Sequence, residues 1–326
     1  MKRPPQLSSM AAYTVKRLLW LALTLLFISL VTFVLMHSVR GGPWDAEDRR
    51  VPPQQVENLN RKYGLDEPLW RQYTLFLENA VQGDLGLSFQ RQDRSVTGII
   101  LAGFKVTAVL GLMAFLLATA VGITLGVYSA LHRNRLPDYG GVFFATLGAA
   151  VPAFVLGIFL KTVFAVELGW FATFGWSTSD GVIPGWLPRW DQLVLPVVTL
   201  AALPAAYTAR ITRASVLEVL QQDYMRTARA KGLGAGTVLV NHALRNAAIP
   251  ILTVAGPILA ALVTGSFIVE EVFEVPGIGR AFVDSVGNRD YGMIMGTTLF
   301  YAFVVVLANL VVDVSYALVD PRVRLK

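Results

Sequence analysis

The chain has 326 residues, of which 54% are hydrophobic and 15% are charged. Soluble domains carry roughly 25% charged residues, so this composition predicts an integral membrane protein with no separate soluble catalytic domain of ordinary size. The net charge of +6 does not indicate nucleic-acid binding, because the basic residues flank apolar segments. Without any cysteine the chain has no disulfide, thiolate nucleophile or Cys-based metal site, and its three histidines lie far apart in the sequence.

Six apolar runs have about the 20 residues that a helix needs to cross the hydrocarbon core. They cover residues 18–36, 104–128, 142–166, 193–209, 249–269 and 293–318. The first run follows Lys16 and Arg17 as a signal peptide would, but it is longer than a typical signal core and no small-x-small cleavage site follows it. We therefore expect a permanent anchor and an all-α protein with six transmembrane helices.

The segment between the first two runs, residues 37–103, is predicted to be a long extracytoplasmic loop. Within it Leu69, Tyr73, Phe76 and Ala80 recur at helical spacing. This pattern predicts an amphipathic helix over 69–81, lying on the outer surface against the bundle or lipid.

Lys and Arg residues set the expected orientation, because short cytoplasmic loops are enriched in them. Fifteen of them flank the runs on one side: Lys2, Arg3, Lys16, Arg17, Arg133, Arg135, Arg210, Arg213, Arg226, Arg229, Lys231, Arg245, Arg322, Arg324 and Lys326. The short loops of the other side hold only Arg189, Arg280 and Arg289. Both ends, residues 1–17 and 319–326, and the loop 210–248 are therefore expected in the cytoplasm, with residues 104–318 forming the transmembrane core.

The loop 210–248 contains the pattern of a short capped helix. Asp223 is expected to cap a helix that continues to Ala230, since its carboxylate accepts amide hydrogens of the first turn, and Gly232 or Gly234 is expected to end it. The sequence predicts that Tyr224, Ala228 and Lys231 share one face, while small and basic residues allow close approach to a partner with an acidic rim. The alternative is a basic loop that only satisfies the charge rule.

A second candidate site lies between the last two runs. Three acidic residues, Glu270, Glu271 and Glu274, precede a turn built from Pro276, Gly277 and Gly279 and followed by Arg280. Proline and glycine favour chain reversal, so we expect a turn and a short helix at the mouth of a pathway. The acidic residues would meet a docking partner or a positively charged substrate; alternatively, this is only a structured loop.

Several ordered blocks resemble the peptide/nickel (Dpp/Opp) family of ABC importer permeases, in its B-type form. DYMRTARAKGL at 223–233, followed by NHALRNAAIP at 241–250, resembles the EAA loop of these permeases. The segments 64–89, 268–291 and 316–324 resemble the same family in the same order. Arg226 and Thr227 stand where Glu and Ala are usual in the general EAA pattern, and Leu244-Arg245 where Leu-Pro is usual; these departures match the peptide/nickel subfamily.

The resemblance implies a non-catalytic permease subunit of the bacterial inner or plasma membrane, carrying di- or oligopeptides. It implies a coupling helix that contacts a cytoplasmic ATPase through Asp223, Tyr224, Arg226, Thr227, Ala228, Arg229, Ala230, Lys231 and Gly232. The chain has no G-x-x-x-x-G-K-[ST] phosphate loop, so it is expected to hold no cofactor itself, while two ABC ATPase subunits would bind ATP and Mg. The other implied partners are a second permease of the homologous C type, an extracytoplasmic binding protein and membrane lipid, without nucleic acid.

Other functions remain open at this point. Within the same fold and mechanism, the cargo could be nickel, haem, glutathione or an oligosaccharide. A secondary transporter or channel would be expected to show inverted repeats or ionisable residues in several spans. An intramembrane hydrolase would need a nucleophile with its base, or a metal cluster, and the sequence shows neither pattern.

Overall fold

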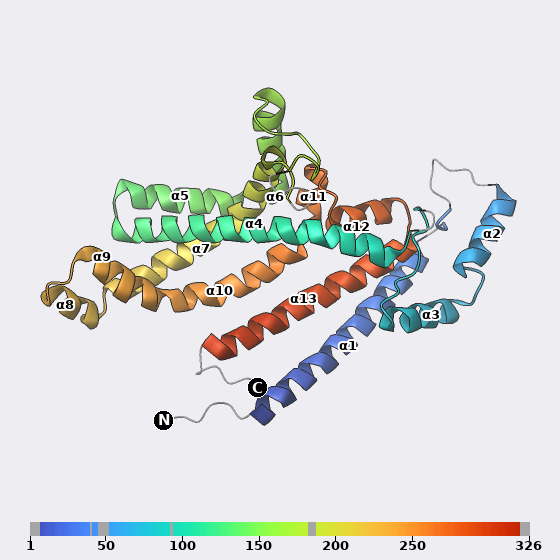
Figure 1. The fold of residues 1–326 in the computed structure, drawn as a ribbon, viewed down its shortest axis with the longest axis horizontal. Helices are drawn as coiled ribbons and strands as arrows, with labels where there is room; N and C mark the ends of the chain where they lie inside the picture. The colour runs from blue at the N-terminus through green and yellow to red at the C-terminus, as the bar shows by residue number, and fades with distance from the viewer. Residues whose placement is uncertain (1–6, 40, 45–51, 92–93, 182–186, 320–326) are drawn as a thin grey trace. The chain divides into compact units, whose positions relative to one another are not determined.

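The fold was obtained as a computed structural model, which describes residues 7–39, 41–44, 52–91, 94–181 and 187–319 (Figure 1). Over these ranges the regular secondary structure is helical apart from isolated bridge residues at Leu87, Ser95 and Leu187, of which Leu87 and Ser95 pair with each other. The chain forms two compact units. Unit 1 is Met1–Thr107 with Pro276–Lys326, and unit 2 is Ala108–Val275.

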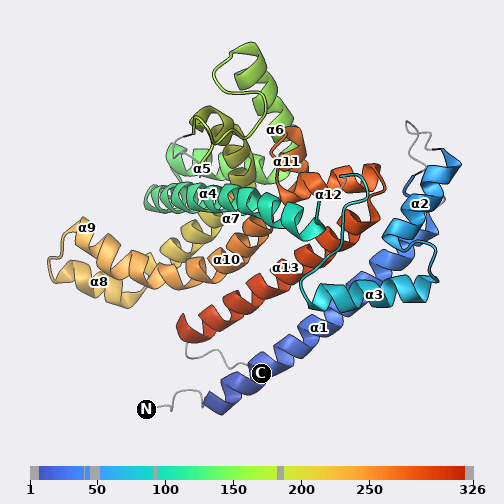
Figure 2. The same ribbon diagram turned by 45° about the vertical axis from the view of Figure 1, so that its right-hand side comes forward.

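Unit 1 is built on two long apolar helices, α1 (Leu7–Ser38) and α13 (Tyr291–Val319). They run antiparallel and side by side (Figures 1 and 2). The other helices of the unit are α2 (Pro53–Tyr63), α3 (Leu69–Val81), the first turns of α4 (Val96–Leu131) and α12 (Ile278–Gly287).

The amphipathic helix predicted over 69–81 is confirmed as α3. Its Tyr73 hydroxyl forms a 2.9 Å hydrogen bond with the Ser29 hydroxyl of α1, and Phe76 packs against the buried cluster around Phe33. Helix α2 was not predicted, although the sequence contains its signals. Pro53 occupies the first helical position, and Gly64 ends the helix in a left-handed conformation with φ +68°.

Unit 2 holds the later turns of α4 and the segments up to Val275. These segments are α5 (Leu136–Ala150), α6 (Ala153–Leu160), the π-helical η1 (Lys161–Glu167), α7 (Trp190–Leu220), α8 (Asp223–Ala230), α9 (Ala235–Thr237), the π-helical η2 (Val238–Leu244), α10 (Arg245–Thr264) and α11 (Phe267–Val272). Helix α7 is central, since α5, α6 and α10 all pack against it.

Close packing of α4 on α7 depends on the G-x-x-x-G pair Gly122 and Gly126. A Cβ on Gly122 would lie 2.6 Å from Thr208 Cβ, and one on Gly126 would lie 2.6 Å from the Ala209 carbonyl oxygen. No side chain fits at those distances, so the two glycines act in helix packing.

The prediction of one continuous span over 142–166 is wrong. The chain breaks at Val151, and the two helical pieces 136–148 and 153–167 meet at 101°. Pro152 explains the break, because proline lacks an amide hydrogen and disfavours a helical conformation for the residue before it, and Val151 is extended with ψ 122°. Five described helices are long and apolar enough to cross a membrane, or six if this bent pair is one span.

Much of the predicted loop 210–248 is helical. Helix α7 continues to Leu220, and the continuous helical segment formed by α9, η2 and α10 begins at Ala235. Residues Thr212 and Val216, in the part of α7 read as loop, are fully buried. The non-helical connection is therefore shorter than predicted, because helices with mixed polar and apolar faces extend past the apolar runs.

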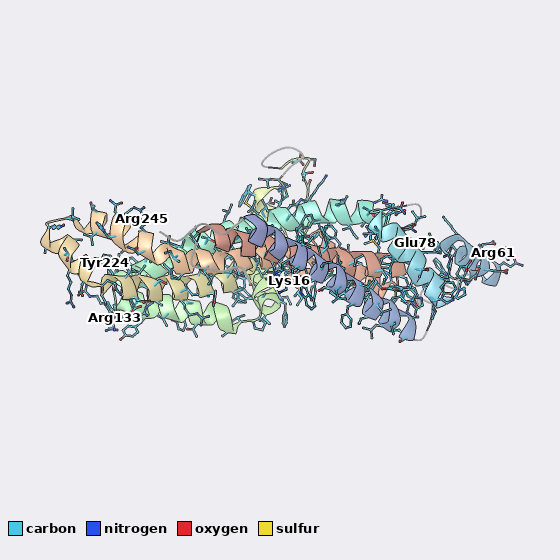
Figure 3. All side chains as sticks on the ribbon, turned by 90° about the horizontal axis from the view of Figure 1, so that it is seen from below. Lys16, Arg61, Glu78, Arg133, Tyr224 and Arg245 are labelled. Atoms are coloured by element: carbon cyan, nitrogen blue, oxygen red, sulfur yellow. The ribbon has the colours of Figure 1, made fainter. Side chains whose placement is uncertain are left out.

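Figure 3 labels residues of both units. In unit 2, Arg133, Tyr224 and Arg245 gather at one end, and in unit 1 Lys16 lies away from Arg61 and Glu78. The predicted cytoplasmic tails fall largely on residues 1–6 and 320–326, which lie outside the described residues together with Lys2, Arg3, Arg322, Arg324 and Lys326.

Candidate functional site

Helix α8 joins α7 to η2 at the end of unit 2 that carries Arg133 and Arg245 (Figure 3). Its bounds, Asp223–Ala230, are those predicted, but the predicted cap is wrong. Gln222 is the N-cap residue, and no side chain caps the helix. Asp223 instead lies in the first turn, where its negative charge favours the positive end of the helix dipole.

Two side chains attach α8 to its own bundle. Met225 is fully buried and Ala228 is 6% exposed, and both pack against Val238 and Ala243 of η2. Because consecutive helix residues are 100° apart, the residues directly opposite Met225 and Ala228 form the face of α8 that points away from η2. Asp223, Arg226, Thr227 and Ala230 form this outward face, and all are exposed.

This orientation corrects the predicted docking face. Ala228 points into unit 2 and is not available to a partner, because its neighbours are Met225 and the residues of η2. Tyr224, which is 42% exposed, and Arg229 flank the buried face, and Lys231 follows the helix as its C-cap residue. Sequence periodicity identified the helix but could not identify the face that the bundle covers.

Gly232 ends the helix as predicted. It has φ +78°, a conformation that only glycine adopts without strain, and its amide donates to the Arg229 carbonyl at 2.9 Å. The Leu233 amide donates back to the Ala228 carbonyl at 3.4 Å. Arg229 lies in the last turn, where a positive charge favours the helix dipole. Arg226 and Asp223 approach to 3.7 Å, but both side chains are exposed, and such surface pairs contribute little stability.

An ion pair that the sequence did not reveal joins α5 to α7 in the same unit. Arg213 donates through Nε and Nη2 to the two carboxylate oxygens of Asp138, at 2.6 and 2.8 Å. The carboxylate of Asp138 also accepts from the Ser129 hydroxyl and, at 2.9 Å, from the Asn134 amide. Asp138 is 2% exposed, so this bidentate pair fixes the turn between α4 and α5 against α7.

The acidic group after α10 only partly agrees with the predicted docking surface. Glu270 is 0% exposed and therefore does not belong to an exposed acidic patch, while Glu271 is exposed. The residue with a positive φ in this turn is not one of the glycines. Glu274 has φ +52°, whereas Gly277 is extended, with φ −89° and ψ −177°.

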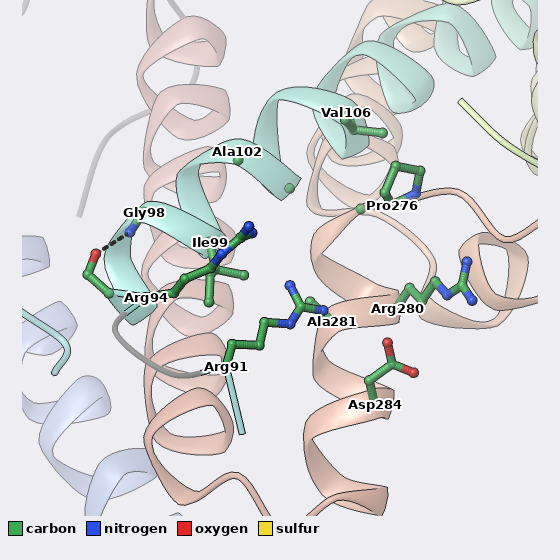
Figure 4. Close-up of a pocket in the computed structure, with 13 residues that line it drawn as sticks. Arg91, Arg94, Gly98, Ile99, Ala102, Val106, Pro276, Arg280, Ala281 and Asp284 are labelled. Atoms are coloured by element: carbon green, nitrogen blue, oxygen red, sulfur yellow. Dashed lines mark hydrogen bonds between the residues drawn. The ribbon is translucent and has the colours of Figure 1, made fainter. Parts of the chain in front are cut away.

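In unit 1 the turn leads into α12, which provides the predicted short helix after Pro276. The Ile278 amide donates to the Thr107 hydroxyl of α4 at 3.0 Å, and a Cβ on Gly103 would lie 3.1 Å from the Ile278 nitrogen. Gly277 and Gly279 are buried, and Arg280 is half-buried. A cavity of about 690 Å³ lies beside this contact and includes Pro276, Gly277 and Arg280 in its lining (Figure 4).

The loop that forms the other wall of the cavity is anchored by Asp290, which precedes α13. Its carboxylate accepts from the Ser88 hydroxyl at 2.5 Å, the Phe89 amide at 3.0 Å and the Met293 amide at 3.2 Å. Asp290 is 3% exposed, so these bonds are shielded from water. The sequence placed Asp290 in a family-like block but gave no sign that it joins two segments 200 residues apart.

The chain matches two family models. Residues 122–325 match the model described as binding-protein-dependent transport system inner membrane component, and residues 10–111 match its N-terminal companion. The fold is similar to that of an amino acid ABC transporter, with TM-score 0.52, 16% identity, 70% of this chain covered and 95% of that one. It is also similar to the inward-facing MetNI methionine ABC transporter, with TM-score 0.53, 17% identity, 68% of this chain covered and 96% of that one.

Curated relatives extend over nearly the whole chain. The dipeptide transport system permease DppB of Bacillus subtilis is 41% identical over 97% of this chain and 99% of its own length. The oligopeptide permease OppB of Haemophilus influenzae is 38% identical, and the glutathione permease GsiC of Escherichia coli is 42% identical; each covers 97% of this chain and 100% of its own length. The chain therefore belongs to the family of inner membrane components of binding-protein-dependent transport systems, as a multi-pass permease of the peptide ABC importer group.

Proposed function

We propose that this chain forms half of the translocation path of an ATP-driven importer for short peptides. The observation that carries the proposal is the 41% identity with the dipeptide permease DppB over almost the full length of both chains. The exposed outward face of α8 supports it, since a permease without its own phosphate loop must receive force from a separate ATPase.

In this proposal α8 is the coupling helix. Asp223, Arg226, Thr227 and Ala230 would contact the ATPase, with Tyr224, Arg229, Lys231 and Gly232 at the edges of the contact. Moving a two-state bundle from 1:99 to 99:1 needs about 5.5 kcal/mol of differential binding. Because Met225 and Ala228 fix α8 to η2, free energy from ATPase binding at α8 can shift the positions of α7 and α10.

The remaining partners follow from the same proposal. Two ABC ATPase subunits would bind ATP and Mg, a homologous C-type permease would form the other half of the path, and an extracytoplasmic binding protein would deliver the cargo. Both termini and α8 would face the cytoplasm of a bacterial cell. This chain would catalyse no reaction and bind no nucleic acid.

A second cargo is favoured by one observation. The glutathione permease GsiC is 42% identical to this chain over its whole length, so glutathione, itself a tripeptide, is the alternative. Nickel, haem and oligosaccharide are named by none of these relatives.

Purification from bacterial membranes followed by reconstitution tests the proposal. A tagged chain should bring with it a second permease and two Walker-motif ATPases, and vesicles of this complex should take up labelled dipeptide when ATP and the binding protein are present. Glutathione uptake with no dipeptide uptake would select the alternative. Uptake that needs no ATPase would contradict the importer function.

A further inference from the structure

The cavity in unit 1 carries an unusual concentration of positive charge. Among the residues that the structure describes, its lining includes three guanidinium groups, from Arg91, Arg94 and Arg280, and one carboxylate, from Asp284. The other described lining residues are uncharged. Figure 4 shows Arg91 and Arg94 extending from the loop into the space between α4 and α12, with Arg280 and Asp284 on successive turns of α12.

Hydrogen bonds fix the backbone that presents the first two arginines. The Arg91 amide donates to the Ser88 hydroxyl at 2.9 Å, and the Arg94 amide donates to the Arg91 carbonyl at 3.1 Å. The Ser88 amide in turn donates to the Arg94 carbonyl at 3.0 Å. Since Asp290 holds Ser88, these hydrogen bonds fix the backbone positions of Arg91 and Arg94, which lowers the entropy cost of binding.

The wall formed by α4 and α12 is mainly apolar. It presents Ile99, Ala102, Val106 and Ala281 to the cavity. A volume of about 690 Å³ lies within the range of roughly 300–1,000 Å³ that is usual for small-molecule sites, which combine apolar walls with a few polar groups. The cavity therefore has the size and lining of a site for a small amphipathic anion.

We propose that this cavity binds the C-terminal carboxylate of a short peptide as it enters the permease, an inference that rests on the function proposed above. The planar guanidinium group donates two parallel hydrogen bonds to a carboxylate, so Arg91 and Arg94 supply the anchor. Arg280 adds positive charge on the facing helix. Asp284, the carboxylate among the described lining residues, faces the ammonium end of a zwitterionic peptide.

A cysteine introduced into this cysteine-free chain reports occupancy of the cavity. Ala102→Cys, on the exposed apolar wall, is prepared in the assembled transporter in lipid nanodiscs and reacted with a charged methanethiosulfonate. Ala-Ala dipeptide should slow the reaction. Ala-Ala amide, which lacks the carboxylate, should need about tenfold higher concentration for the same protection, a difference of about 1.4 kcal/mol.

Replacing the arginines tests the anchor directly. Adding Arg91→Gln and Arg94→Gln to Ala102→Cys should abolish the difference between dipeptide and amide, and each single replacement should reduce it if the double variant fails to assemble. Val81→Cys, at an 89% exposed position of α3 outside the cavity lining, is the matched control and should react at one rate with or without peptide.

Three results would overturn the inference. They are equal protection by dipeptide and amide, unchanged discrimination in the arginine variants, and protection by sulfate at the same concentration as dipeptide, which would indicate a general anion site. Failure of the proposed function is separable from these, because it appears as absent dipeptide uptake by the unmodified complex. Uptake without carboxylate-dependent protection would refute the cavity assignment alone.

Discussion

Glutamate substitutions two residues apart on α8 should affect different properties: one should lower the stability of the permease, and the other should weaken its association with the ATPase. Ala228→Glu places a carboxylate where the side chain is 6% exposed and surrounded by Met225, Val238 and Ala243. An uncompensated buried charge costs about 3–5 kcal/mol, so this variant should lose the packing of α8 on η2. Ala230→Glu lies on the exposed outward face and should change the free energy of unfolding by less than about 0.5 kcal/mol.

The same Ala230→Glu variant should lose its association with the ATPase. A carboxylate buried at a tight interface without a partner costs about 2–5 kcal/mol, which corresponds to roughly 30-fold or greater weakening of association. The assay measures thermal unfolding of the purified permease, the ratio of co-purified ATPase, and cargo-stimulated ATP hydrolysis. Ala230→Ser is the matched control and should match the original protein in all three.

The outward face and the buried face of α8 can be tested separately. Unaltered ATPase association and transport in Ala230→Glu would show that the outward face of α8 is not the coupling surface. Unaltered thermal stability in Ala228→Glu would show that α8 does not pack on η2 as described here. The second result would leave the family assignment untouched, because that rests on sequence identity over the whole chain.

Three further predictions test the packing and the orientation. Gly126→Ala should lower the free energy of unfolding by about 1–3 kcal/mol, because its Cβ would lie 2.6 Å from the Ala209 carbonyl oxygen. Gly140→Ala is the control and should be neutral or stabilising, because a Cβ there would meet nothing within 4 Å. Thermal unfolding of both variants measures the difference. Asp290→Ala should lower stability by about 3 kcal/mol or more, since it leaves the Ser88 hydroxyl and three amides without their acceptor, and an unchanged melting temperature would contradict the anchoring role. Single cysteines at Ser179 and Val286 should react with an impermeant reagent applied to intact cells and one at Thr237 should not; labelling at Thr237 would reverse the proposed orientation.

Local sequence patterns predicted the elements that depend on local physics. The spacing of Leu69, Tyr73, Phe76 and Ala80 predicted α3, and the two candidate terminating glycines, Gly232 and Gly234, predicted the end of α8, which the structure places at Gly232 with a positive φ. Span number was predictable from apolar length, but the bend at Val151 required attention to the proline that follows it. The sequence contained that signal, but apolar length alone predicted a continuous span.

Properties that depend on contacts distant in the sequence were not predictable in this way. The buried face of α8 is decided by η2, so the periodicity of the helix alone could not distinguish Ala228 from Ala230. The Asp138–Arg213 pair joins residues 75 positions apart, and Ser88 and Asp290 are 202 positions apart. A single sequence shows polar residues at these places but not which of them meet.

The connections of α8 explain how a force applied there would spread through unit 2. Its N-terminal end continues directly from α7 through Gln221 and Gln222, whose amides donate to the last turn of α7 at 3.2 and 3.1 Å. Its buried side chains contact η2, which continues without a break into α10. Because α7 and α10 also pack against each other, a displacement of α8 would act on both helices. The Arg213–Asp138 pair connects them to α5, so a force applied at α8 would reach three packed helices rather than a single flexible connection.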